Sequence, residues 1–133
     1  MKKITHWYDT EFSIFYKYYY GDIEYKDLVS DWTQLINEGK IPQGVKKFIL
    51  DYRKADLLAP PHMAIDIANF YKENIDCFLN ARVALIMQKP DQVVLPILAN
   101  QECQEVLKFK PFYTLEAAFN WVNELNFLTT NYS

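Results

Sequence analysis

The sequence predicts one α/β domain, in which a mixed β-sheet of about five strands carries four helices in the order ββαβαβαβα. Three observations support this prediction. The chain has 133 residues, and no linker, repeat or low-complexity tract divides it, so residues 1–133 are expected to form a single domain. Half of the residues are hydrophobic, which is enough for a packed core. Strand-like and helix-like segments alternate along most of the chain.

The N-terminal segment predicts a β-hairpin. Residues 3–8 and 12–20 are rich in aromatic side chains, and a polar break at residues 9–11 separates them. In the second strand, the even-numbered positions share one face and the odd-numbered positions share the other, because side chains alternate with a period of two. Both faces carry aromatic residues.

A helix is predicted over residues 25–38. Its apolar positions Leu28, Trp32, Leu35 and Ile36 follow a 3.6-residue period, and Gly39 is a suitable stop. The next strand, residues 45–52, contains a continuous apolar run at positions 48–50. Such a run is typical of a strand that is covered on both faces.

The remaining elements complete the alternation. They are a helix from Pro60 to about residue 74, a strand at 82–88, a helix at 90–103, a strand at 105–109 and a helix at 115–126. Pro96 lies inside the fourth segment, so that helix must kink, start late or be partly extended. Strands joined by helices become parallel neighbours through right-handed crossovers, and the hairpin adds an antiparallel edge.

Charge and composition argue against several classes of protein. The formal net charge is −3, and no basic stripe exists that could contact duplex nucleic acid. No apolar run is long enough to span a bilayer, and no signal-peptide core follows the first lysines. Cys77 and Cys103 do not form a CxxC motif and are expected to be reduced. We therefore expect a cytoplasmic protein that neither inserts into membranes nor binds nucleic acid.

Motifs for metal, cofactor or nucleophilic chemistry are missing from the sequence. His6, His62, Cys77 and Cys103 lack the spacing of metal ligands. Three glycines are too few for a glycine-rich phosphate loop, and none of the three serines lies in a nucleophile elbow. The sequence thus predicts no metal, no cofactor and no catalytic residue.

Four short motifs occur in a characteristic order. They are YYYGDI at 18–23, FILDYRKA at 48–55, ARVALI at 81–86 and F-x-T-x3-A-x2-W at 112–121. With these motifs the chain resembles the STAS-like group related to sporulation anti-sigma-factor antagonists, in particular its SpoIIAA-like, STAS/SEC14-type branch. The resemblance implies a SpoIIAA-like fold. It also implies a non-enzymatic regulatory module that binds a protein partner or a small apolar ligand.

The best-known members of this group are switched by phosphorylation of a serine at the start of the second helix. In this chain Asp56 stands where the motif has its aspartate, and Leu57 stands in place of the serine. No serine or threonine occurs between Thr33 and Thr114. The phosphorylation switch therefore does not carry over.

Four polar residues follow the central strand and are candidates for ligand binding: Asp51, Arg53, Asp56 and His62. Ligands of open α/β sheets bind at the carboxyl ends of the strands. Arg53 could hold an anion or polar ligand that Asp51 orients, or the two could form a structural pair that ties the loop to a helix. An alternative function is a small hydrolase or isomerase that uses Asp51, Arg53 and His62, provided that His62 does not simply face solvent.

The aromatic hairpin is a candidate interface. Trp7, Phe15 and Tyr19 could contact a protein partner or a second copy of the chain in a homodimer, because Tyr and Trp are enriched in interface cores. Alternatively, helices or cross-strand pairs cover these rings. Stacking of single-stranded nucleic acid is disfavoured, because Lys17 is the only basic residue among them.

Overall fold

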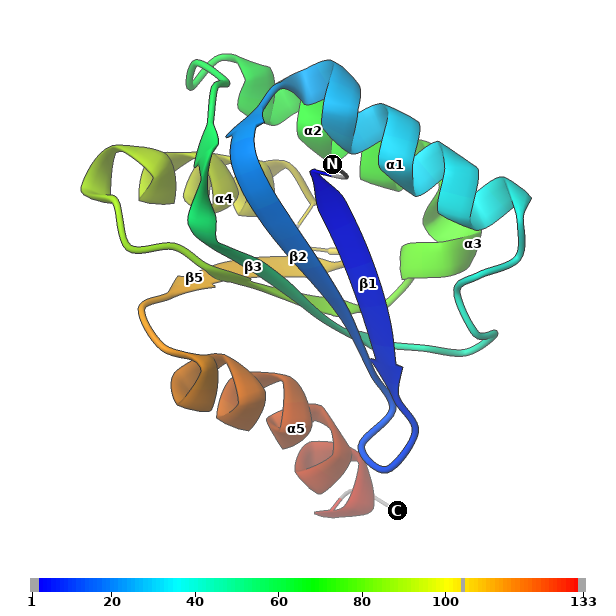
Figure 1. Cartoon of the computed structure of the whole chain (residues 1–133). Coiled ribbons are helices and arrows are strands. Elements are labelled where there is room, and N and C mark those ends of the chain that lie inside the picture. The colour runs from blue at the N-terminus through cyan, green and yellow to red at the C-terminus, as the bar shows by residue number, and fades with distance from the viewer. Residues whose placement is uncertain (1–2, 104, 132–133) are drawn as a thin grey trace.

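Five strands form one sheet in the order β1-β2-β3-β4-β5, which is also their order along the chain (Figure 1). The computed structural model describes residues 3–103 and 105–131, with side chains to residue 124. The strands are β1 (Ile4–Asp9), β2 (Ile14–Ile23), β3 (Lys47–Leu57), β4 (Arg82–Ile86) and β5 (Lys108–Phe112). The helices are α1 (Tyr25–Asn37), α2 (Met63–Glu73), α3 (Ile75–Phe78), α4 (Pro90–Cys103) and α5 (Leu115–Asn131).

The predicted topology is confirmed. β1 is antiparallel to β2, with Ile4 opposite Tyr19, and every later pair is parallel. The described residues contain five helices, one more than predicted, because the short α3 turn follows α2. None of the helices in the described part of the chain is long and apolar enough to cross a membrane.

The two faces of the sheet are covered unequally. Crossovers between parallel strands are right-handed, and the strand order never reverses, so α1, α2, α3 and α4 all lie on one face, the helix-rich face (Figure 1). Only α5 lies on the other, the α5 face. There it packs on β3, β4 and β5.

Each face has its own core. Beneath α1–α4, the rings of Trp32, Phe48 and Phe78 pack edge to face or tilted, with centroids 5.1–5.9 Å apart. A smaller core beneath α5 includes Ile49, Ala118 and Val122. The predicted alternation in the second strand is confirmed, because its even positions face α5 and its odd positions face the larger core.

β3 is longer than predicted. It continues five residues beyond Tyr52 to Leu57, because β2 also continues and supplies a partner, Ile23. The pairing shifts by one residue, since Tyr18 lies opposite Asp51 whereas Tyr20 lies opposite Lys54. This β-bulge places an extra residue in β3. The segment expected to be a loop after the central strand is therefore largely strand.

α4 has the predicted bounds, whereas β5 begins later than predicted. α4 is helical throughout, and Pro96 is buried inside it, so the helix forgoes the hydrogen bond that the missing N–H would have made. β5 begins at Lys108 instead of residue 105, because Val106 and Leu107 turn back to bond Cys103 O. Both sulfhydryls are free, with Cys103 buried and Cys77 half-buried.

Candidate functional site

The carboxyl ends of β2 and β3 form a shallow cavity of about 500 Å³ on the α5 face. The bulge in β3 makes this arrangement possible. Paired residues in neighbouring strands point to the same face, so Asp51 joins Tyr18 and Lys54 joins Tyr20 despite their odd spacing along β3. The lining residues are Tyr18, Tyr19, Tyr20, Asp51, Arg53 and Lys54.

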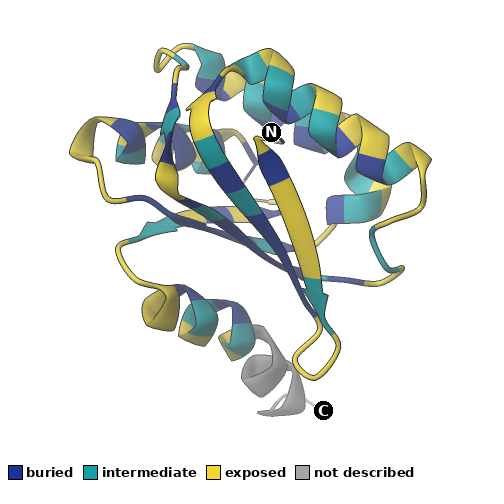
Figure 2. Ribbon diagram, in the orientation of Figure 1, coloured by how far each residue is buried: buried dark blue, intermediate teal, exposed yellow. Residues whose placement is uncertain are grey.

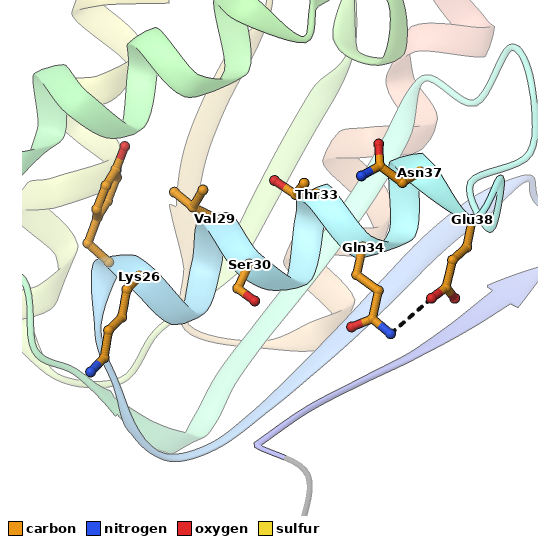
Figure 3. Close-up of a pocket in the computed structure, with 8 residues that line it drawn as sticks. Lys26, Val29, Ser30, Thr33, Gln34, Asn37 and Glu38 are labelled. Carbon is orange, nitrogen blue, oxygen red and sulfur yellow. Dashed lines mark hydrogen bonds between the residues drawn. The ribbon is translucent and has the colours of Figure 1, made fainter.

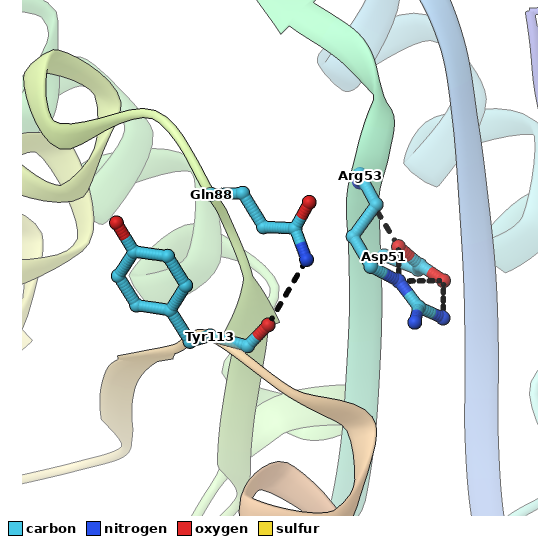
Figure 4. Close-up of polar contacts among 4 residues, drawn as sticks. All are labelled: Asp51, Arg53, Gln88 and Tyr113. Atoms are coloured by element: carbon cyan, nitrogen blue, oxygen red, sulfur yellow. Dashed lines mark hydrogen bonds and ion pairs between the residues drawn. The ribbon is translucent and has the colours of Figure 1, made fainter.

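Asp51 and Arg53 form a bidentate ion pair within β3 (Figure 4). Arg53 Nη2 lies 2.7 Å from Asp51 Oδ2 and Nε lies 3.0 Å from Oδ1, to which the Arg53 backbone N–H also donates. These hydrogen bonds raise the pKa of Arg53 above its ordinary value. Both residues of the pair therefore belong to β3, at its bulge, and the pair does not tie a loop to a helix.

Two further contacts join the ends of β3, β4 and β5. Asp56 forms an ion pair with Lys89, which follows β4. Beside it, Gln88 Nε2 donates to the backbone oxygen of Tyr113 at 3.3 Å (Figure 4). The Asp56 carboxylate thus already has a cationic partner within the fold.

His62 does not join these residues. It is exposed at the start of α2, a helix of the helix-rich face. Asp51 lies two residues after Ile49 in β3, so its side chain points to the α5 face, as that of Ile49 does. Among residues 3–103 and 105–131, no side-chain hydrogen bond or ion pair involves His62. The convergence of Asp51, Arg53 and His62 that a hydrolase or isomerase would need is not found.

Phe15 and Tyr19 are core residues, so their predicted role at an interface is wrong. Phe15 is 0% exposed and Tyr19 1% exposed, because α1 and its neighbours cover the odd-numbered face of β2. Tyr19 stacks on Tyr52 with centroids 4.0 Å apart. Trp7, by contrast, is 54% exposed on β1.

A row of aromatic rings crosses the α5 face beside α5. The ring centroids of Trp7 and Tyr16 lie 5.3 Å apart. Tyr16 stacks on Tyr18, with the ring centroids 6.2 Å apart and the ring planes at 6° to each other. Tyr20 lines the same cavity as Tyr18 and Arg53. We call Trp7, Tyr16, Tyr18 and Tyr20 the aromatic strip. The predicted alternation placed the three tyrosines on one face, but it did not reveal that Tyr16 would be buried beside α5 while Tyr18 and Tyr20 stay half-buried.

The hydroxyls of Tyr16 and Tyr18 are held in their protonated form. Partial burial, with smaller effects from Asp9 and Tyr18, raises the pKa of Tyr16 to about 12. Burial also raises the pKa of Tyr18, and Asp51 adds to the effect. At neutral pH Tyr16 and Tyr18 therefore offer neutral rings and hydroxyl groups that can donate hydrogen bonds.

Other hollows are less specific. One of about 710 Å³ runs along the outer surface of α1, from Tyr25 to Glu38 (Figure 3). Among its lining side chains, Gln34 Nε2 donates a hydrogen bond to Glu38 Oε2 at 3.0 Å. An apolar cavity between α2, α4 and β3 measures about 30 Å³, the volume of one water molecule. Within the described positions, no group of three or more His, Cys, Asp or Glu residues could hold a metal ion.

Comparison with known proteins identifies the fold. No protein-family model and no curated protein matches the chain. The crystal structure of an uncharacterized protein of the DUF3478 family from Shewanella loihica PV-4, described as having a SpoIIAA-like fold, is similar with a TM-score of 0.60. The two chains are 20% identical, over 90% of this chain and 91% of the other. This chain therefore has a SpoIIAA-like fold, as the resemblance implied.

Proposed function

We propose that this protein is a non-enzymatic regulatory module of SpoIIAA-like fold that binds a protein partner through the aromatic strip. The observation that carries the proposal is the exposure of Trp7 at one end of a continuous row of rings. A row of this kind would be covered by a helix in an isolated core. Here α5 packs on β3, β4 and β5, and only Tyr16 of the row is buried, whereas Trp7 is exposed and Tyr18 and Tyr20 are half-buried.

The chemistry of the strip favours a protein over a small apolar ligand. Trp, Tyr and Arg are the residues most enriched in interface hot spots, and Arg53 borders the strip at Tyr18. The apolar cavity of about 30 Å³ is far smaller than the roughly 300 Å³ or more that a ligand pocket requires. The larger cavity at the carboxyl ends of β2 and β3 is lined by charged and hydroxyl-bearing side chains, which suits a polar segment of a protein better than an apolar molecule.

The pairing of charges at the carboxyl edge supports a binding role more than a catalytic one. Arg53 is bonded to Asp51, and Lys89 to Asp56. A general base or nucleophile must be within hydrogen-bond reach of its partner group, and His62 lies at the start of a helix on the opposite face.

Regulation by a phosphoserine at the second helix finds no support. α2 begins at Met63, and Pro60, Pro61 and His62 precede it. None of these residues carries a hydroxyl group. In this proposal the protein is regulated by whether its strip is occupied.

Site-specific photo-crosslinking tests the proposal. A benzophenone amino acid replaces Tyr18 or, separately, Trp7, and in a control it replaces Ile65, which is 52% exposed on α2. We expect the same protein adduct from positions 18 and 7 and not from position 65. The adduct at position 18 should disappear when Trp7→Ala is added. Equal adducts from all three positions, or none from positions 7 and 18, would overturn the proposal.

A further inference from the structure

The outer edge of β1 carries unused backbone hydrogen-bonding groups. Tyr20 N donates to Lys3 O at 2.8 Å. This bond shows which residues of β1 direct their backbone N–H and C=O groups toward β2 and which direct them outward. Residues of an antiparallel pair alternate between hydrogen-bonded and non-hydrogen-bonded positions, so Thr5 and Trp7 face β2. The N–H and C=O groups of Ile4, His6 and Tyr8 face outward, and within the described part of the chain nothing bonds to them.

The other edge of the sheet is protected. In β5, Pro111 has no N–H group, and the N–H of Phe109 donates to Asn100 Oδ1 at 2.9 Å. Lys108 and Lys110 flank these positions. Proline, lysine and local capping are the usual means by which edge strands avoid pairing. Between Ile4 and Tyr8, β1 has no proline, no lysine and no bulge, and most of the strand is exposed (Figure 2).

We propose that β1 pairs antiparallel with β1 of a second copy of this chain, so that two sheets join into one across a two-fold axis at His6. In this register His6 lies opposite His6 of the partner subunit. Ile4 lies opposite Tyr8 of the partner subunit, and Thr5 opposite the partner's Trp7. The arrangement is isologous, as expected of a symmetric dimer.

Two features select this register among the antiparallel ones. It bonds all the outward backbone groups of Ile4, His6 and Tyr8, whereas a shift by two residues leaves one of the three unpaired on each copy. It also places Lys3 opposite Asp9 of the partner subunit, so that opposite charges meet at both ends of the new pair. Lys3 remains half exposed, although it donates to Asp22 O at 2.8 Å and lies 3.6 Å from Asp27 Oδ2.

Dimerisation would join the two aromatic strips. Opposite residues share a face, so Trp7 of each copy lies on the same side of the joined sheet, next to Thr5 of the other. The dimer would present one aromatic surface of twice the length. This inference goes beyond the proposed function and does not depend on it.

Analytical ultracentrifugation over about 5–500 μM protein tests the dimer. We expect a reversible change from the monomer mass of 15.8 kDa to twice that mass. His6→Pro should remain monomeric, because it removes an outward N–H group and leaves the β1–β2 ladder intact. His6→Ala, the matched control, loses the same ring but keeps the N–H and should still dimerise. Circular dichroism verifies that both variants are folded.

Disulfide trapping tests the register. In the proposed pairing, positions 5 and 7 of opposite copies are neighbours in a non-hydrogen-bonded pair, where Cα atoms lie about 4.5 Å apart, within reach of a disulfide. The double variant Thr5→Cys with Trp7→Cys should therefore form a covalent dimer on oxidation. Thr5→Cys alone and Trp7→Cys alone should not. Cys77→Ser is included in all three, because Cys77 is half-buried and free.

The outcomes separate the two proposals. A wild-type protein that is monomeric at every concentration, or a His6→Pro variant that dimerises as well as wild type, would overturn the dimer. Crosslinking by Thr5→Cys alone or Trp7→Cys alone would overturn the register. A monomer that still gives the strip-specific adducts at positions 7 and 18 would leave the proposed function standing.

Discussion

The two faces of the sheet contain similar side chains but are covered very differently. On the helix-rich face, Trp32, Phe48 and Phe78 are buried almost completely beneath helices. On the α5 face, Tyr16 is buried, but Tyr18 and Tyr20 are only half-buried and Trp7 is exposed. The difference arises from topology. When every right-handed crossover proceeds in one direction, all crossover helices fall on one side, and the other side depends on the element that follows the last strand.

The largest effect on stability is expected from Trp32→Ala on the helix-rich face. The indole contacts Phe48, Phe78 and Tyr71, so its removal leaves a cavity that the neighbouring rings cannot fill. We expect the free energy of unfolding to fall by about 3–5 kcal/mol, measured by urea denaturation. A loss below about 1 kcal/mol would mean that this core is not the main source of stability.

A second test uses Lys17, which is 0% exposed beneath α1. Its Nζ lies 2.8 Å from Asp31 Oδ2 and 3.6 Å from the Trp32 ring centroid. Burial nevertheless lowers the pKa of Lys17 to about 8 from 10.5, against the opposing effect of Asp31. The folded protein therefore releases this proton at lower pH than the unfolded chain does.

Because the unfolded chain binds more protons between pH 8 and about 10, this lysine makes folding more favourable as the pH rises through that window. Relative to Lys17→Met, the wild type should gain on the order of 2 kcal/mol from pH 8 to pH 10, measured by urea denaturation at each pH. A constant difference between the two proteins would contradict the burial of a charged amine.

A smaller effect is expected from Ile86→Val on the α5 face. Ile86 is fully buried beside Ala118 and Val122, but only one helix covers it. Removing one methylene there should lower the free energy of unfolding by about 1 kcal/mol. A thermal melt of the variant against wild type checks this value. A loss as large as that of Trp32→Ala would remove the distinction between the two cores.

The smallest effect on stability is expected from Trp7→Ala. The indole is 54% exposed and contacts Tyr16 on one side only. We expect a change within about 0.5 kcal/mol of wild type, together with loss of the position-18 adduct. If Trp7→Ala destabilised the protein as much as Ile86→Val does, the strip would be a structural surface and not a recognition surface.

The alternation in β2 and the stripe in α1 could be predicted because they follow from the geometry of single elements. Ile14, Tyr16, Phe15 and Tyr19 all lie on the expected faces. Which face would stay uncovered could not be predicted, because it depends on where α5 packs. Phe15 and Tyr19 were therefore assigned to an interface, although both are core residues, and of the three predicted interface residues only Trp7 is exposed.

The carboxyl edge was less predictable for a different reason. The pairing of β3 with β2 carries the strand past Asp51 to Leu57, and the bulge turns Lys54 to the face of Asp51. Neither the length of a strand nor a bulge can be derived from local periodicity, because both depend on the partner strand. His62 could not be placed either, since the face on which α2 packs decides its neighbours.

The order of the strands has a consequence for how the chain folds. Each strand pairs with the next one in sequence, so each pairing closes either the β1–β2 hairpin or a single crossover. Low sequence separation between contacts favours rapid folding. The sheet can therefore grow as the chain is synthesised, with each new strand adding to an edge that already exists. α5, which packs back onto β3 and β4, can join the sheet only after all five strands have been synthesised, because it follows β5 in the sequence.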